Sequence, residues 1–232
     1  MNNAYLNQCI SFINSQTVVP AGRPAAMQVR RAVTISRQTG CGGLIVAEKL
    51  AKFLQARAPR EDVAWTVFDR ELMDKVLADH HLPQYLAKFL PEDRMSRIED
   101  TLADIFGVHP TAETMVQQTA ETILQLAELG NAILIGRAGN IVTAKLPNVL
   151  HVRLVASLED RIARICRDYG NTPAGARKFC LEEDQARARY VKTYFKADIA
   201  DPLLYHLVLN TSRMDYDHVA QLIGEAMLRQ VV

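Results

Sequence analysis

From residue 31 onward, short runs rich in β-branched residues alternate with longer segments of helical periodicity. Strands that alternate with helices along a chain form βαβ units, whose strands run parallel in one sheet. We therefore predict an α/β fold with a doubly wound, parallel, five-stranded sheet. The predicted strands cover residues 32–36, 64–68, 132–135, 149–154 and 205–209.

Helix boundaries are marked at two places. Ser157 begins an acidic capping pattern, Ser-Leu-Glu-Asp, which predicts a helix start directly after the fourth strand. A second helix is predicted from Thr111, since apolar residues recur on one face until Gly130, and glycine commonly ends a helix. About sixty residues separate the second and third strands, which is too many for one crossover helix. We therefore expect an all-helical insertion over residues 70–130 that covers the site.

Polar residues directly follow three of the predicted strands. Ser36 and Arg37 follow the first strand, Asp69 the second and Arg137 the third. Ligands of doubly wound sheets bind at the carboxyl ends of the strands. We therefore expect these side chains to meet at one edge of the sheet.

The segment SRQTGCGG lies between the first strand and a helix predicted over residues 44–57. Backbone N–H groups at such a helix start, together with the positive end of the helix dipole, bind anions. Glycines in the segment permit a tight turn and the close approach of a phosphate. We predict that this loop binds a nucleotide phosphate with Ser36, Arg37, Gln38, Thr39, Gly40, Cys41, Gly42 and Gly43.

The loop departs from the usual phosphate-loop pattern, G-x-x-x-x-G-K-[ST], at three positions. Arg37 replaces the first glycine, Gly43 the lysine and Leu44 the hydroxyl residue that binds magnesium. Arg37 is placed to restore the lost positive charge. Two other interpretations stay open. One is a dinucleotide-binding fingerprint with Asp69 as the ribose-binding acid, although Ile45 replaces its third glycine. The other is a glycine-rich turn without a ligand.

Residues 174–196 carry many cations among acidic residues at helical spacing. A solvated helix laced with ion pairs is one interpretation of such a segment. Because this segment precedes the last strand of a phosphate-binding fold, we favour phosphate contacts by Arg187 and Arg189. Asp184 lies three residues before Arg187, where it can hold that guanidinium or orient Mg²⁺ through water.

Overall composition narrows the class of partners. The chain has 232 residues and a formal net charge of +1, so no general electrostatic field favours nucleic acid or an acidic membrane. Its four cysteines are widely spaced, which indicates neither a disulfide framework nor a zinc site. The sequence shows no apolar run of bilayer-spanning length and no signal-peptide pattern. We expect a soluble, cytoplasmic protein without a nucleic-acid or membrane partner.

Residues 1–30 differ in composition from the rest of the chain. They contain no acidic residue, and their apolar residues recur at helical spacing before a Pro/Gly linker. We predict a short amphipathic helix that packs on the domain or on a twin subunit, which leaves a homodimer open.

Five stretches of the sequence follow, in order, the motifs of one known family. The stretches resemble the cytidylate kinase-like family, a branch of the nucleoside monophosphate kinases, over about residues 31–232. This resemblance implies a P-loop kinase fold with a five-stranded core, a helical nucleotide-binding insertion at about 70–130 and a mobile lid at about 172–198. The motifs are ISRQTGCGG, VFDRELMDKV, ILIGRAGNIV, VLHVRLVASLEDRIARI, and DQARARYVKTYF followed by DPLLYHLVLNTSRM.

The resemblance also implies an activity, which is transfer of the γ-phosphoryl group of ATP, with Mg²⁺, to a nucleoside monophosphate such as CMP or dCMP. Asp69 and Lys75 take the places of substrate-binding residues, and Asp69 is a second candidate for holding Mg²⁺ through water. Arg137 matches the arginine of a G-R-D signature, whose Asp is Ala138 here. The remaining alternative is a nucleotide-binding sensor or regulatory protein that has lost turnover. The catalytic residues implied are Arg37, Arg137, Arg187 and Arg189.

Overall fold

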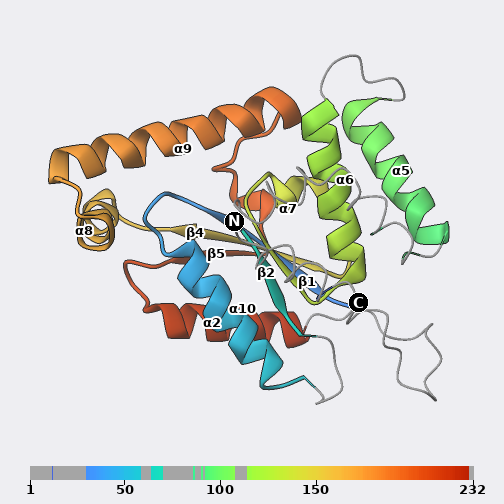
Figure 1. The fold of residues 1–232 in the computed structure, drawn as a ribbon, viewed down its shortest axis with the longest axis horizontal. Coiled ribbons are helices and arrows are strands. Elements are labelled where there is room, and N and C mark those ends of the chain that lie inside the picture. The colour runs from blue at the N-terminus through green and yellow to red at the C-terminus, as the bar shows by residue number, and fades with distance from the viewer. Residues whose placement is uncertain are drawn as a thin grey trace, which may run out of the picture.

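The computed structural model describes residues 12, 30–58, 64–69, 86, 90, 92–107 and 114–229. Five parallel strands form one sheet in the order β2-β3-β1-β4-β5, with β1 at its centre (Figure 1). The predicted five-stranded, parallel α/β fold of P-loop kinase type is therefore confirmed. The strands are β1 (Ala32–Arg37), β2 (Thr66–Phe68), β3 (Ala132–Ile135), β4 (Val149–Val155) and β5 (Leu207–Asn210).

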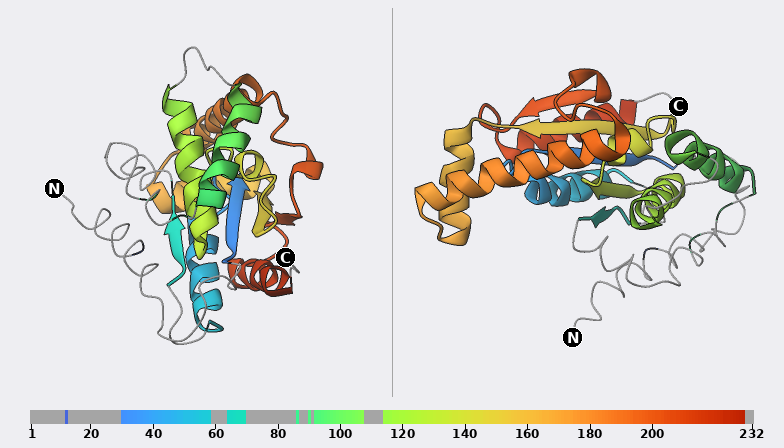
Figure 2. Two further views of the ribbon diagram at one scale, coloured as in Figure 1. Left: turned by 90° about the vertical axis from the view of Figure 1, so that its right-hand side faces the viewer. Right: turned by 90° about the horizontal axis from the view of Figure 1, so that it is seen from above.

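Helices cover both faces of the sheet. They are α2 (Gly43–Gln55), α5 (Glu92–Phe106), α6 (Thr114–Leu129), α7 (Gly139–Val142), α8 (Leu158–Tyr169), α9 (Pro173–Phe195), α10 (Tyr216–Arg229) and the 3₁₀ turn η2 (Pro202–Leu204). α2 and α10 pack together on one face, over a core that includes Val33, Ile35 and Val152. α6 and α7 lie on the other face, and α5 packs outside α6 (Figures 1 and 2).

α9 is a single helix of 23 residues that reaches from α8 to α5 (Figure 1). Near its start, Ala176 and Cys180 pack against Ile165 of α8. At its end, the ring of Phe195 lies 6.1 Å from the ring of Phe106 in α5. α9 is therefore anchored by apolar contacts at both ends, while its middle passes the ends of the strands.

Most predicted boundaries agree with the structure to within two residues. Ser157 caps α8, because its hydroxyl accepts the N–H of Asp160 at 3.2 Å, and Gly130 follows the last residue of α6. β2 and β5 begin two residues later than predicted. For β5 the reason is local. Asp201 caps the η2 turn, so the chain becomes a strand only after Tyr205.

Several predictions fall outside the described residues, namely Lys75, the cap at Thr111 and the helix within residues 1–30. α5 and α6 lie within the predicted insertion, and α9 lies within the predicted lid. The division of the chain into these units stays a prediction. Among the helices that the structure describes, none has the length and apolar character needed to cross a membrane.

A polar strip follows the face of the sheet that α7 covers. Thr34 and Ser36 of β1 stand in register with His151 and Arg153 of β4. Thr34 Oγ1 and His151 Nδ1 are 2.9 Å apart, and the His151 ring stacks on the ring of His206 with centroids 4.9 Å apart. Burial first, and then the neighbouring His206, lower the pKa of His151 to about 4. His151 is therefore neutral at pH 7.

We expect acidification to destabilise the folded protein through His151. The pKa of this group falls from 6.5 to about 4 on folding, so below pH 6.5 the unfolded chain binds the proton first. Stability that is fully present above pH 6.5 is then lost as the pH falls toward 4. Between pH 6.5 and 5 the loss is about 2 kcal/mol, measured as the free energy of urea unfolding. The His151→Asn variant should flatten this part of the profile, and an equally steep profile in the variant would assign the effect to other groups.

Candidate functional site

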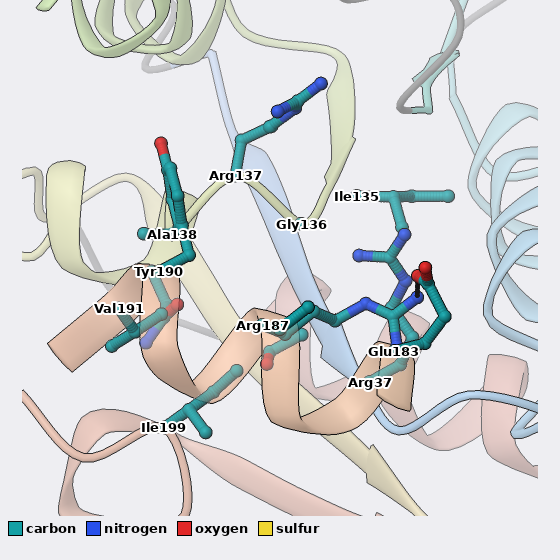
Figure 3. Close-up of a pocket in the computed structure, with 13 residues that line it drawn as sticks. Arg37, Ile135, Gly136, Arg137, Ala138, Glu183, Arg187, Tyr190, Val191 and Ile199 are labelled. Atoms are coloured by element: carbon teal, nitrogen blue, oxygen red, sulfur yellow. Dashed lines mark hydrogen bonds and ion pairs between the residues drawn. The ribbon is translucent and has the colours of Figure 1, made fainter. Parts of the chain in front are cut away.

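A cavity of about 250 Å³ lies where β1 and β3 end, and α9 forms its opposite wall (Figure 3). Ser36 and Arg37 end β1, Arg137 follows β3, and Arg187 projects from α9. The cavity thus lies at the carboxyl edge of the sheet, where the sequence predicts a ligand. A parallel sheet with side chains from two strand ends and one covering helix is a usual architecture for nucleotide binding.

Two glycines leave room for the side chain of Arg37. A Cβ atom on Gly43 would lie 3.2 Å from Arg37 Cγ, and a Cβ atom on Gly136 would lie 2.2 Å from Arg37 Nη1. The side chain therefore passes Gly43, where the usual loop carries lysine, and its guanidinium ends beside Gly136. Absence of a side chain at Gly43 is thus what gives Arg37 room to bring a positive charge over the loop.

The structure brings together three of the four predicted catalytic arginines. Arg37, Arg137 and Arg187 line the cavity, and Figure 3 shows Arg137 directed away from Arg187 and Glu183. Arg137 has a φ of +53°, a strained value that is common at functional sites. Arg187 Nη2 lies 3.1 Å from Glu183 Oε2. Arg189 is exposed on α9 and is not part of the cavity wall, so its role stays a prediction.

A carboxylate from α9 occupies the loop. The N–H and the hydroxyl of Thr39 both donate to Asp184 Oδ1, at 2.7 and 2.8 Å. The other oxygen, Oδ2, accepts from Arg161 Nη1 at 2.6 Å, and Arg187 Nη1 lies 3.2 Å from Oδ1. Asp184 therefore holds the guanidinium of Arg187, one of its two predicted roles, and it also connects α9 to the loop.

Two arginines of α8 were missed by the sequence analysis. Arg161 is buried and donates to the carbonyl of Thr39 as well as to Asp184. Arg164 donates to the carbonyl of Gly40 at 3.3 Å and to Thr211. A signal was available, because the Ser157 cap places the first turns of α8 at the end of β4, beside β1. Arg161 and Arg164, three residues apart in these turns, could therefore have been predicted to contact the loop.

Other residues of the loop have structural roles. The N–H of Gln38 donates to the carbonyl of Leu154, and its side-chain oxygen accepts the N–H of Ala156, so Gln38 fastens the loop to the end of β4. A Cβ atom on Gly40 would lie 2.9 Å from the carbonyl oxygen of Arg161, so α8 approaches the loop closely there. Burial raises the pKa of the Cys41 thiol to about 11. Cys41 therefore stays protonated at neutral pH and acts as a small packing residue.

We expect Gly42→Ala to destabilise the loop. Gly42 has a φ of +74° and immediately precedes α2, and an added Cβ would lie 2.3 Å from Tyr216 Cζ. The expected loss is about 2 kcal/mol in the free energy of unfolding, from backbone strain together with displacement of the tyrosine ring. Gly170→Ala is the matched control, since Gly170 has a φ of +68° and nothing within 4 Å of an added Cβ. The control should lose about 1 kcal/mol. Equal losses would show that contact with Tyr216 is unimportant.

Neither of the two predicted magnesium ligands, Asp69 and Asp184, lines the cavity, and their role toward Mg²⁺ stays a prediction. Asp184 accepts hydrogen bonds from Arg161 and Arg187, so two cations already neutralise it. Asp69 follows β2, is half-buried and is not part of the cavity wall. In the part of the chain that the structure describes, no three His, Cys, Asp or Glu side chains are grouped for a metal.

The profile of the cytidylate kinase-like family matches residues 32–213, a range that includes the loop, both strand ends and α9. The chain belongs to the cytidylate kinase-like family. The resemblance read from the motifs is therefore confirmed, and the family suggests nucleotide kinase chemistry.

Known proteins similar to this cytidylate kinase-like chain cover it in part. The cytidylate kinase of Methanopyrus kandleri is 32% identical over 111 residues, 44% of this chain and 58% of that protein. The uronate isomerase of Corynebacterium glutamicum is 28% identical over 116 residues, 50% of this chain and 22% of that protein. The chain thus matches less than two thirds of the length of either curated relative. An uncharacterised protein from Eubacterium ventriosum shares the fold, with a TM-score of 0.62, 17% identity, and coverage of 86% of this chain and 99% of that one.

Proposed function

We propose that this protein transfers the γ-phosphoryl group of ATP to a nucleoside monophosphate, with CMP and dCMP as the preferred acceptors. The observation that carries the proposal is the Asp184 carboxylate within the loop. One of its oxygens accepts from Thr39 and the other from Arg161, so the loop and its arginines hold an oxyanion. A phosphoryl group is an oxyanion with more charge and more acceptor oxygens. Release of Asp184 frees the same donors for a nucleotide phosphate.

The side chains around the cavity suit this chemistry. Phosphoryl transfer needs alignment of donor and acceptor, neutralisation of charge on the transferred group, and exclusion of water. In the proposed reaction, loop N–H groups hold the donor phosphates and Arg37 supplies the charge that lysine supplies in the usual loop. Arg187 and Arg137 approach the transferred group from α9 and from the end of β3. ATP brings Mg²⁺ as its counter-ion.

The size of the cavity supports a site that opens to admit ligands. Its volume of about 250 Å³ is below the roughly 300–1,000 Å³ of typical small-molecule sites. A kinase must also hold two nucleotides at once. α9 supplies Glu183, Arg187 and Tyr190 to the wall. We infer that α9 moves away from the strand ends when nucleotides enter and closes over them before transfer.

Turnover is the direct test of the proposed function. Purified protein is incubated with ATP, Mg²⁺ and each nucleoside monophosphate in turn, and both ADP and the new nucleoside diphosphate are measured. We expect CMP or dCMP to be phosphorylated above the rate of ADP formation without an acceptor. The same rate with and without every acceptor contradicts the kinase proposal.

A nucleotide sensor without turnover is the second candidate, and three residues favour it. Gly43 and Leu44 remove the lysine and the hydroxyl of the usual loop, and Ala138 replaces the signature Asp. A sensor would bind ATP or CMP, with a rise in melting temperature, and form no ADP. A ligand at 100 times its Kd stabilises a protein by about 2.7 kcal/mol, which thermal unfolding detects readily.

A further inference from the structure

Arg153 is a buried cation without an acidic partner among the residues that the structure describes. This residue of β4 is 7% exposed, and its Nη1 donates to Ser36 Oγ at 2.8 Å. Among the described residues, no carboxylate forms an ion pair with it. Arg161 shows the contrast, because it is 5% exposed and pairs with Asp184 at 2.6 Å. A buried charge is costly unless an opposite charge compensates it. Arg153 therefore lacks the compensation that Arg161 has.

The described groups that surround Arg153 carry no negative charge. Its guanidinium carbon lies 5.6 Å from the centre of the Tyr205 ring. The hydroxyl of Tyr205 donates to the carbonyl of Ile199 at 2.9 Å and lies 3.3 Å from Ser36 Oγ. The next side chain along this face of β4 is His151, which is neutral at pH 7. The described groups that contact Arg153 therefore leave its charge uncompensated, and Glu183, the carboxylate in the cavity wall, pairs with Arg187 instead.

Ser36 lies between the buried guanidinium of Arg153 and the cavity. Its side chain lines the cavity, as does Ile199, and its oxygen accepts the hydrogen bond from Arg153. A serine hydroxyl has one proton to donate, and among the described residues its nearest acceptor outside its own backbone is the Tyr205 hydroxyl, at a long 3.3 Å. A ligand oxygen in the cavity can replace this long contact with a shorter hydrogen bond from Ser36, and the buried guanidinium behind Ser36 favours an oxygen that carries negative charge.

We propose that Arg153, Ser36 and Tyr205 form an anion subsite in which Ser36 donates to the phosphate of the acceptor nucleotide, while Arg153 acts as a positioning residue behind it. The proposal rests on the proposed function. It assigns the subsite to the acceptor nucleotide rather than to ATP because of the face of the sheet on which these residues lie. Ser36 and Arg153 face the side that α7 covers, whereas α2, which begins at the loop, packs on the other side. We call these three residues the Ser36 subsite.

The test compares ligand binding with the stability of the unliganded protein. CMP, cytidine and ATP are titrated calorimetrically into wild type, Arg153→Met, Ser36→Ala and the double variant. We expect about tenfold weaker CMP binding in each single variant, since a hydrogen bond to a charged group is lost. The double variant should be little weaker than either single variant, because both act on one contact. Cytidine and ATP should bind each variant within about twofold of wild type.

Stability separates a positioning role from a structural one. Removal of an uncompensated buried charge should leave the melting temperature of unliganded Arg153→Met unchanged or higher. Arg153→Lys keeps the charge and should retain part of the CMP affinity. Arg213→Met, at an exposed position, is the control for loss of a cation and should bind CMP as wild type does.

Two outcomes of the titrations and melting curves overturn the proposal, and a third comes from turnover. One is a lower melting temperature in Arg153→Met with unchanged CMP affinity, which would make Arg153 a structural cation. The other is an equal loss of ATP and CMP affinity, which would place the anion in the donor site. Wild type that binds CMP but forms no product would refute the kinase proposal and leave the Ser36 subsite standing. Normal turnover with unchanged CMP affinity in the variants would refute the subsite alone.

Discussion

Replacement of Arg37 by alanine is expected to lower kcat/KM for phosphoryl transfer by at least about 10³, the scale measured for single arginines in phosphoryl transfer. Arg37 is the side chain that passes Gly43 and carries its charge over the loop, in the position where other loops use lysine. Its loss should therefore affect the transition state as well as ATP binding. The unliganded protein should lose no more than about 1 kcal/mol in the free energy of unfolding, because the side chain is only half-buried.

Steady-state kinetics with ATP and the preferred monophosphate measure this effect. Arg177→Ala is the matched control, since Arg177 is an exposed arginine of α9 outside the cavity wall, and its kcat/KM should stay within about twofold of wild type. Arg37→Lys should recover part of the rate, because the charge is kept while the paired donors of the guanidinium are lost. A loss below tenfold in Arg37→Ala would remove Arg37 from the reaction.

The second large effect is expected from Asp184→Ala, with a loss of about 3 kcal/mol in the free energy of unfolding. The Arg161 side chain is 6% exposed and its ion pair with Asp184 is its only one among the described residues. Without Asp184, this buried guanidinium has no opposite charge. Asp168→Ala is the control, because it breaks an exposed pair with Arg167 and should cost at most about 1 kcal/mol.

A phosphate ligand should reverse part of this loss. Inorganic tripolyphosphate offers the loop and Arg161 the oxyanion that the variant lacks, and in wild type it must first displace the Asp184 carboxylate. Urea unfolding with and without tripolyphosphate should therefore show a larger stabilisation of Asp184→Ala than of wild type. Equal stabilisation of the two proteins would mean that the carboxylate and the phosphate bind at different places.

The order of strands and helices could be predicted because each element is marked by residues that lie close together in the sequence. Runs of β-branched residues, the Ser157 cap and the glycine at the end of α6 are read within a few residues of chain, and each appears in the structure. The loop was equally readable, since its glycines and its position between a strand and a helix are local features. Within the site, the sequence placed Arg37, Arg137 and Arg187 at the strand ends and on α9, and all three line one cavity.

The rest of the site depends on contacts between distant segments. Asp184 and Thr39 are 145 residues apart, and no spacing in the sequence reports that a carboxylate of α9 meets the loop. Arg153 is one of two polar residues in an otherwise apolar strand, and only its register opposite Ser36 reveals its significance. Arg189 shares its segment and charge with Arg187, but their separation of two residues turns their side chains to different sides of the helix.

The construction of α9 also limits how the protein can be regulated. Asp184, Arg187 and Val191 recur at helical spacing on α9, a single helix roughly 35 Å long. The side chain that accepts hydrogen bonds from the loop and the side chains that line the cavity therefore belong to the same helix. If α9 moves as we propose, rotation about its two apolar contacts would release the loop and widen the cavity in the same movement. We therefore expect occupancy of the loop by Asp184 and the volume of the cavity to change together. A substitution at the contact between Phe195 and Phe106, far from any phosphate, would then shift both together.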